Sequence, residues 1–200
     1  MQATDRELLD QWRDGDKEAG NALFKRHFES IRRFFRNKTD LKETEDLIQR
    51  TFLACAESAH GYRGEGSFRA YLFVIARRQL IDHIHRKTRD EGRAEPDLTV
   101  ASIADIGFSP SAIVAKLQEH EIIAEAMRRI PVDFQITLEL YYWEQLRGAE
   151  LAAVLGVAPA TVRTRLHRAR EAMRAALATL RTDGVESDVE DSVSALGAHL

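Results

Sequence analysis

Cysteine is almost absent from this chain of 200 residues, which contains only Cys55. A single cysteine cannot form a disulfide within the chain. Because Cys55 lies in an apolar helical pattern, a buried structural thiol is favoured over a reactive one. Long apolar runs are also lacking, since no segment approaches the roughly 20 residues that a membrane-spanning helix needs. The N-terminus is acidic and polar, unlike a secretory signal. We therefore expect a cytoplasmic protein without membrane insertion.

Proline and glycine are scarce, at four and eleven residues, and fall mostly between periodic apolar segments. Apolar residues recur at steps of three and four, with few alternating β-branched runs, which predicts helices nearly throughout. Phe28 and Leu53 belong to these apolar faces, so we expect both in the core. In the first half of the chain, helices are expected at about 5–13, 17–38, 42–58 and 68–89.

The helical periodicity fades over residues 93–115, which include Pro96 and Pro110. We interpret this stretch as a flexible linker; fully extended, the chain from Gly92 to Ala115 could span about 80 Å. Helices resume at about 117–130, 132–145, 148–155 and from 159 onward. The predicted fold class is all-α, with two small helical domains (1–92 and 116–181), the linker 93–115 between them and an acidic tail at 182–200.

The formal net charge of −3 hides a strong segregation of charge along the chain. Residues 62–89 contain seven Lys or Arg against two acidic residues, and residues 158–181 contain six against one. The tail 182–200 contains five acidic residues and no Lys or Arg. Two basic segments far apart in the sequence indicate a polyanion that is contacted at two places.

The second basic segment has the sequence form of a helix-turn-helix. Gly156 suits the left-handed residue that ends a helix, and Pro159 suits the first position of the next one. Residues on one side of that helix form a predicted packing stripe, namely Val162, Leu166, Ala169 and Met173. Others point away, where they would reach DNA bases in a major groove or phosphates, namely Arg163, Thr164, His167, Arg168 and Arg170. The alternative is a solvated amphipathic helix whose arginines serve only solubility. The positively charged residues of this helix are all arginines, which suit bidentate contacts with phosphates and bases, and this favours DNA binding.

The first basic segment interleaves aromatic residues with arginines. Stacking rings beside cations suit the unstacked bases of a single strand. The alternative is that the aromatic residues are simply core, which leaves mainly Tyr71 and the arginines available. His83 and His85 are two residues apart, so on a helix they do not face each other, and a metal site is not expected. No nucleophile–base pairing or phosphate cradle occurs, so neither catalysis nor a cofactor is expected.

Three segments, "TEDLIQRTFLACAES", "SFRAYLFVIARRQLIDHIHRKTR" and "GAELAAVLGVAPATVRTRLHRARE", occur in this order. They resemble the polymerase-docking, −10 and −35 regions of bacterial sigma factors of the short, extracytoplasmic-function (ECF) type. The resemblance covers about residues 4–181. It implies core RNA polymerase, promoter DNA and an anti-sigma factor as partners, and a role in promoter-specific transcription initiation.

The resemblance also assigns roles to individual residues. Polymerase docking is assigned to Asp46, Gln49 and Phe52, which without the resemblance would be two surface residues and a core residue. The −10 element is assigned to Tyr62, Arg63, Phe68, Tyr71, Arg77, Arg78, Asp82 and Arg86. The −35 element is assigned to the outward-facing residues of the helix-turn-helix named above. Arg50 departs from the family pattern, because an acidic residue is usual there.

Two alternatives remain for the whole chain and two for its tail. A stand-alone helix-turn-helix regulator would bind an operator without polymerase, and an interaction module would bind only protein. The tail is either a disordered solubilising end or an amphipathic helix that docks on the second domain. In the helix, one face would carry Val185, Val189, Val193 and Leu196.

Overall fold

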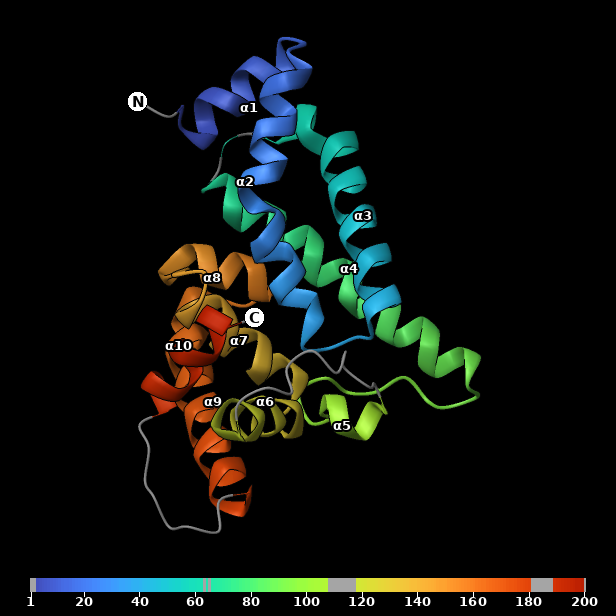
Figure 1. The fold of residues 1–200 in the computed structure, drawn as a ribbon, viewed down its shortest axis with the longest axis vertical. Helices are drawn as coiled ribbons and strands as arrows, with labels where there is room; N and C mark the ends of the chain where they lie inside the picture. The colour runs from blue at the N-terminus through green and yellow to red at the C-terminus, as the bar shows by residue number, and fades with distance from the viewer. Residues whose placement is uncertain (1–2, 63, 65, 108–117, 181–188, 200) are drawn as a thin grey trace.

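The computed structural model describes residues 3–62, 64, 66–107, 118–180 and 189–199, and Figure 1 shows helices throughout this part of the chain. No strand occurs in these ranges, where β-type pairing is limited to an isolated bridge between Ser102 and Pro131. The all-α class predicted from the sequence is confirmed.

The N-terminal half consists of long helices that start where the local sequence provides a cap. Thr4 and Asp40 each begin a helix with a capping box, in which the side chain of the cap and that of Glu7 or Glu43 satisfy backbone N–H groups. The helices follow the predicted limits within two residues. They are α1 (Asp5–Arg13), α2 (Lys17–Arg36), α3 (Leu41–Ser58), the 3-10 turn η1 (Ala59–Gly61) and α4 (Phe68–Asp90).

Aromatic rings pack at the centre of the N-terminal half. Phe34 meets Phe35 and Phe73 edge to face, with ring centroids 5.2 and 5.5 Å apart, and all three are buried. Cys55 is also fully buried, and burial raises the pKa of its thiol to about 12. The prediction of a buried structural thiol is confirmed.

The described part of the expected linker, residues 93–107, packs against the C-terminal half. The backbone N–H of Val132 donates to the carbonyl of Ala101 at 3.0 Å, and that of Asp133 donates to the carbonyl of Leu98 at 3.1 Å. This segment includes the short helix α5 (Ile103–Ile106) and buries Leu98, Ile103 and Ile106. The packing of residues 93–107 differs from the flexible linker expected from composition; the rest of the linker, residues 108–115, lies outside the described residues.

The C-terminal half comprises α6 (Gln118–Arg129), α7 (Val132–Tyr142), α8 (Gly148–Leu155), α9 (Pro159–Leu180) and α10 (Val189–His199). Helix α10 belongs to the tail, and its Val189, Val193 and Leu196 are almost completely buried against α6, α7 and α9. The structure therefore agrees with the second alternative for the tail, an amphipathic helix docked on the second domain, over residues 189–199. Val185 lies outside the described residues.

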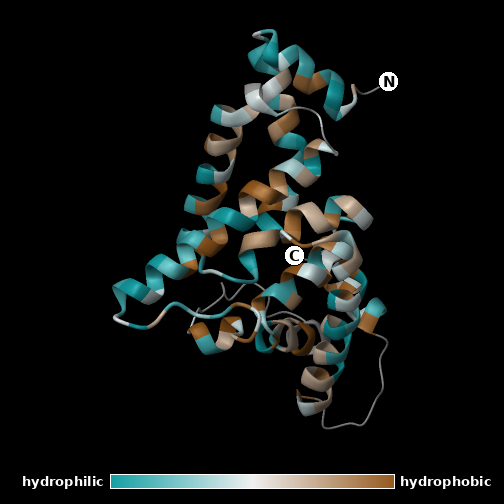
Figure 2. Cartoon of the chain, turned by 180° about the vertical axis from the view of Figure 1, so that it is seen from behind, coloured by the Kyte–Doolittle hydropathy of each residue, from teal (hydrophilic) through white to brown (hydrophobic). Residues whose placement is uncertain are grey.

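The two halves pack directly on each other. Helix α8 lies against α4, and one hydrophobic cluster contains Leu72 and Phe73 of α4 together with Leu151 and Leu155 of α8. Figure 2 shows apolar segments in brown in the middle of the molecule, where the halves meet. The structure is thus a closed arrangement, in which the expected −10 helix is in contact with the helix-turn-helix.

Lower pH should destabilise the fold through His27, which joins α2 to α1. Its Nε2 lies 2.7 Å from Oδ2 of Asp5, and burial lowers the pKa of His27 although the Asp5 carboxylate opposes this. The unfolded chain then binds the histidine proton more readily than the folded chain. The free energy of unfolding should therefore fall as the pH drops below about 6.5, the ordinary pKa of histidine.

Urea unfolding at pH 7 and at pH 5.5 would measure this dependence. In the variant His27→Gln the difference between the two pH values should be smaller. An unchanged difference would show that other groups cause it.

Candidate polymerase and nucleic-acid interface

Helices α8 and α9 form the predicted helix-turn-helix. Gly156 ends α8 with a left-handed φ of 67°, which glycine adopts without strain, and Pro159 is the first residue of α9. The predicted stripe of α9 is buried and packs it against the rest of the half, through Val162, Leu166, Ala169 and Met173. This packing fixes which side of α9 faces solvent.

The solvent face of α9 carries the side chains expected to read the −35 element. Arg163, Thr164, His167 and Arg168 are all exposed, and Nε2 of His167 lies 3.5 Å from Oε1 of Glu171 on the same face. Their arrangement on one open side of a helix suits insertion into a major groove.

Two further arginines of α9 lie closer to the protein. Nε of Arg170 donates to Oη of Tyr142 at 2.8 Å, and its guanidinium lies over the rings of Tyr141 and Tyr142. Nη1 of Arg165 lies 3.1 Å from Oδ2 of Asp133. The sequence analysis did not identify Arg165 as a residue that joins α9 to α7. Arg165 lies three residues after Val162, on the flank of the packing stripe, and this position could have indicated a contact with the rest of the protein.

Stacked tyrosines lie at the start of α4, where the −10 surface is expected. The rings of Tyr62 and Tyr71 are 4.4 Å apart and nearly parallel, Oη of Tyr62 donates to the carbonyl of Gly66, and Oη of Tyr71 lies 2.6 Å from Oγ of Ser58. Both rings are partly exposed. Phe68, also assigned to the −10 surface, is buried and packs in the core instead.

The polar residues expected at the −10 element divide between two sides of α4. Arg78, Asp82 and Arg86 are exposed and follow one another at steps of four, so they share one face; Arg78 is 82% exposed. Arg77 turns instead toward α7, with Nη2 3.0 Å from Oδ1 of Asp133. Arg63 lies outside the described residues.

Helix α3 presents the residues assigned to polymerase docking. Asp46 is partly exposed, with 48% of its side chain accessible, Gln49 is exposed, and Phe52 is partly buried between Phe24 and Phe28. Leu53 is 60% exposed and Phe28 is 41% exposed, so the expectation that both lie in the core was wrong. The exposed apolar patch thus consists of Phe28, Phe52 and Leu53, and it lies beside two polar side chains. This composition suits helix-to-helix docking.

Arg50 forms an ion pair with Asp46 at 2.7 Å, one helical turn away. An exposed ion pair of this kind stabilises the helix by about 0.3–0.5 kcal/mol. This energy is lost when Asp46 turns to polymerase, so replacing Arg50 by glutamine should strengthen polymerase binding about twofold. Fluorescence anisotropy with core polymerase would measure this. Lys42→Gln, an exposed change of the same charge on the same helix, is the control. Weaker binding of the Arg50 variant would mean that Arg50 itself contacts polymerase.

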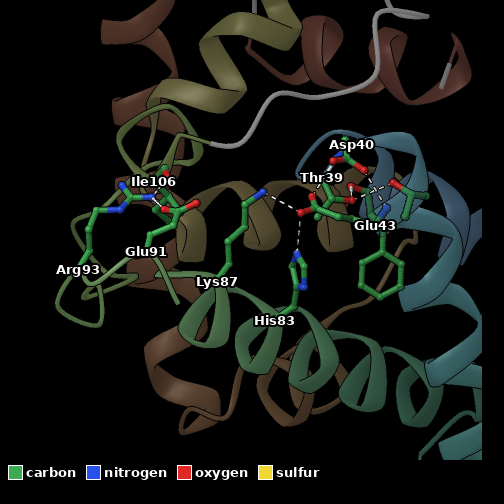
Figure 3. A network of polar contacts seen from close by, with 10 residues as sticks. Thr39, Asp40, Glu43, His83, Lys87, Glu91, Arg93 and Ile106 are labelled. Atoms are coloured by element: carbon green, nitrogen blue, oxygen red, sulfur yellow. Dashed lines mark hydrogen bonds and ion pairs between the residues drawn. The ribbon is translucent and has the colours of Figure 1, made fainter. Parts of the chain in front are cut away.

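A polar network holds α3 against α4 and so positions both expected surfaces. Oε1 of Glu43 accepts from Nζ of Lys87 at 2.7 Å and lies 3.6 Å from Nε2 of His83 (Figure 3). His85 points to a different carboxylate, that of Glu95, at 3.7 Å. Within the described residues no cluster of three potential metal ligands occurs.

Seen together, a helix-turn-helix with outward arginines and a basic helix beside stacked tyrosines define a protein of the transcription-initiation class. The family model for ECF sigma factors matches residues 4–179, and the chain belongs to this family.

Several known proteins resemble the chain. It is 34% identical over 139 residues to a probable RNA polymerase sigma factor, RfaY, of Xanthomonas campestris pv. campestris, a match that covers 68% of this chain and 34% of that protein. It is 27% identical over 188 residues to the ECF RNA polymerase sigma factor SigW of Bacillus subtilis, covering 90% and 100%. The solved structure of CnrH in complex with the cytosolic domain of CnrY has the same fold. Its TM-score is 0.63 at 23% identity, over 88% of this chain and 97% of that one.

In the part of the chain that the structure describes, none of the helices combines the length and apolarity needed to cross a membrane.

Proposed function

We propose that this chain binds core RNA polymerase and directs it to promoters by recognising −10 and −35 elements. The observation that carries the proposal is that three faces of different composition lie on three helices. The docking face of α3 is apolar with polar neighbours, the −10 face of α4 combines tyrosines with arginines, and the −35 face of α9 is basic. Membership of the ECF sigma factor family supports assigning these faces to polymerase, melted strand and duplex.

The mechanism rests on binding energy, and the chain itself catalyses no reaction. The first domain, residues 1–92, docks on polymerase. Its contacts are the polar side chains of Asp46 and Gln49 and the apolar patch beside them. Tyr62 and Tyr71 stack on bases of the melted strand, because every base has a face that an aromatic ring can cover. The exposed arginines of α9, in residues 116–181, donate to base edges and phosphates of the duplex. The protein would act in the cytoplasm, where polymerase and promoter DNA are found.

An anti-sigma factor is a further proposed partner. One similar solved structure is that of the sigma factor RpoE in complex with the anti-sigma factor NepR from Bartonella quintana. The likeness covers 80% of this chain with a TM-score of 0.60 at 19% identity, which supports a shared fold. A protein with this fold offers an inhibitor the same docking and DNA faces.

Reversing the charge of Asp46 tests polymerase docking. We expect Asp46→Arg to weaken binding of core polymerase by at least about tenfold, since unfavourable charges at an interface cost several kcal/mol. Glu45→Arg, an exposed neighbour on α3, is the matched control. Equal binding by wild type, variant and control would place the polymerase contact elsewhere.

The tail would regulate access of the helix-turn-helix to DNA. Burial raises the pKa of Tyr142, with a smaller contribution from the negative charge of Glu190, so α10 brings a carboxylate close to the Tyr142–Arg170 pair. Replacing the exposed Glu190 and Asp191 by glutamine and asparagine should therefore raise promoter-directed transcription as repulsion between the tail and DNA is lost, while the buried face of α10 stays in place. Promoter-directed transcription assays of the variant and wild-type chains would measure this. Unchanged transcription would rule out a regulatory tail.

A further inference from the structure

Arg13, in the last turn of α1, hydrogen-bonds to the loop that connects α3 to α4. This loop, residues 59–67, is described at 59–62, 64, 66 and 67, and it carries Tyr62 of the expected −10 surface. Nε of Arg13 donates to the carbonyl of Ala59 at 3.0 Å. Its Nη2 donates to the same carbonyl at 2.8 Å and also to the carbonyl of Tyr62. One guanidinium group therefore ties the first part of the loop to α1, which lies beside the end of α3 in Figure 1.

The bonds from Arg13 to Ala59 are charge-assisted bonds at the end of a helix. Ala59 directly follows α3, and the last carbonyls of a helix carry partial negative charge because no further turn supplies their donors. The arginine fork suits such a place, since one planar group donates several N–H bonds in fixed directions. Ala59 is buried, and a hydrogen bond is stronger there than in water. The carbonyl is thus a firm attachment point for the loop.

Arg13 also lies next to the stacked tyrosines. Its Cζ is 5.8 Å from the centroid of the Tyr62 ring, and that ring stacks on Tyr71 of α4 at 4.4 Å. The place of the Tyr62 ring depends on the backbone of the same residue, whose carbonyl accepts from Arg13. A shift of this backbone would therefore move the ring relative to Tyr71.

The loop borders open space on two sides. On the side of α1, Tyr62 and Arg13 line a cavity of about 330 Å³. On the side of α4, Tyr62 and Tyr71 line another of about 500 Å³. Further along the loop, Gly64 and Gly66 adopt left-handed φ values of 77° and 81°, which suit glycine. Close packing fixes such a loop less firmly than it fixes a core residue, so polar bonds have a large share in its position.

Two further hydrogen bonds of the loop have different effects. Oη of Tyr62 donates to the carbonyl of Gly66 at 2.9 Å, which fixes the shape of the loop but not its place on the protein. The backbone N–H of Ser67 donates to Oε1 of Glu150 at 2.8 Å, and Glu150 belongs to the C-terminal half. Arg13, in contrast, attaches the loop to its own half of the chain.

We propose that Arg13 is a positioning residue for the −10 surface. By holding the carbonyls of Ala59 and Tyr62, it places the Tyr62 ring where an unstacked base of the melted strand can stack on it. The inference rests on the proposed function for the identity of the −10 surface. Arg13 acts through the loop, so its effect is specific to the base that the tyrosines bind, while the contacts of α9 with the duplex stay the same.

The variant Arg13→Gln tests the proposal in the complex of the full chain with core polymerase. The DNA is a promoter identified by mapping of its RNA 5′ ends, with the −10 region melted in advance by mismatches and single bases replaced in turn by abasic positions. With wild type, we expect one abasic position to weaken binding by about tenfold, a loss typical of one base stacked on an aromatic ring. With Arg13→Gln, binding of the intact DNA should be weaker by about tenfold, and the same abasic position should cost about twofold or less. Fluorescence anisotropy would measure both.

Two further variants separate positioning from charge and from folding. Lys17→Gln removes the same charge from an exposed position of α2 in the same half, and it should keep the full loss at the abasic position. Arg13→Lys retains the charge but replaces the fork by a single ammonium group, so its loss should lie between those of Arg13→Gln and wild type. Circular dichroism verifies folding, and if Arg13→Gln is unfolded, the comparison of Arg13→Lys with wild type decides.

The possible failures of the inference and of the proposed function are distinct. If the abasic position costs the Arg13 variants as much as wild type, the inference is overturned and the proposed function stands. If Lys17→Gln reduces this cost as much as Arg13→Gln does, net charge explains the effect and the inference is overturned. If no abasic position weakens binding by wild type, the −10 role in the proposed function fails, and the inference fails with it.

Discussion

Replacing Glu139 by alanine lowers the free energy of unfolding by about 3–5 kcal/mol, because it leaves the ammonium group of Lys38 buried without its partner. Both side chains are completely buried, 101 positions apart in the sequence. Burial lowers the pKa of Lys38 and raises that of Glu139, and in each case the charge of the partner opposes the shift. Removing one charge therefore removes the compensation for the other. Urea unfolding followed by circular dichroism would measure the loss.

The double variant Lys38→Met/Glu139→Leu is the matched control. It replaces both charges by apolar side chains of similar size, which is often neutral or stabilising for a buried pair. Stability close to that of wild type would show that the loss in Glu139→Ala comes from the unpaired charge. A loss below about 1 kcal/mol in Glu139→Ala would contradict the buried pair, since that value is typical of an exposed one.

Replacing Arg163 and Arg168 by alanine reduces transcription from promoters that depend on a −35 element by about ten- to a hundredfold. Both side chains are exposed on the solvent face of α9, so their loss should leave the fold unchanged. A good base contact is worth about 1–3 kcal/mol of discrimination, and loss of one or two such contacts gives this range. Run-off transcription on intact and altered −35 sequences would measure the effect.

Arg174, which is exposed on the same helix near its far end, provides the control. Arg174→Ala removes one positive charge where the double variant removes two, and it should weaken transcription less and equally on all sequences, as expected for a phosphate contact. If Arg163→Ala/Arg168→Ala lowers transcription equally whether the −35 sequence is intact or altered, α9 does not read bases.

The helices could be predicted because their signals are local. Gly156 and Pro159 mark the turn between α8 and α9 through a backbone conformation that their own residue type provides, and the sequence analysis used both. The limits of α1 and α3 came from apolar spacing, and the structure adds their caps, Thr4 and Asp40. The buried stripe of α9 followed from spacing alone. Leu53 was misplaced because the apolar face of α3 is wider than its contact with the core, and periodicity cannot show where that contact ends.

The closed arrangement could not be predicted from the sequence. The contacts of Lys38 with Glu139 and of Arg77 with Asp133 join residues far apart in the chain, and nothing in the spacing of either residue points to its partner. Composition predicted a free linker, yet Leu98 and Ala101 form backbone hydrogen bonds with the start of α7. The polymerase-docking role of α3 came from the family resemblance, since exposed polar residues look alike without it, whereas the helix-turn-helix pattern already indicated DNA for α9.

Run-off transcription with purified core polymerase, followed by mapping of RNA 5′ ends, is the most direct test of the proposed function. With the chain present, we expect discrete start sites preceded by shared −10 and −35 sequences, and with core polymerase alone we expect none. Tight binding of the free chain to a palindromic DNA site, with no new start sites in the presence of polymerase, would contradict the proposed function and favour a stand-alone helix-turn-helix regulator.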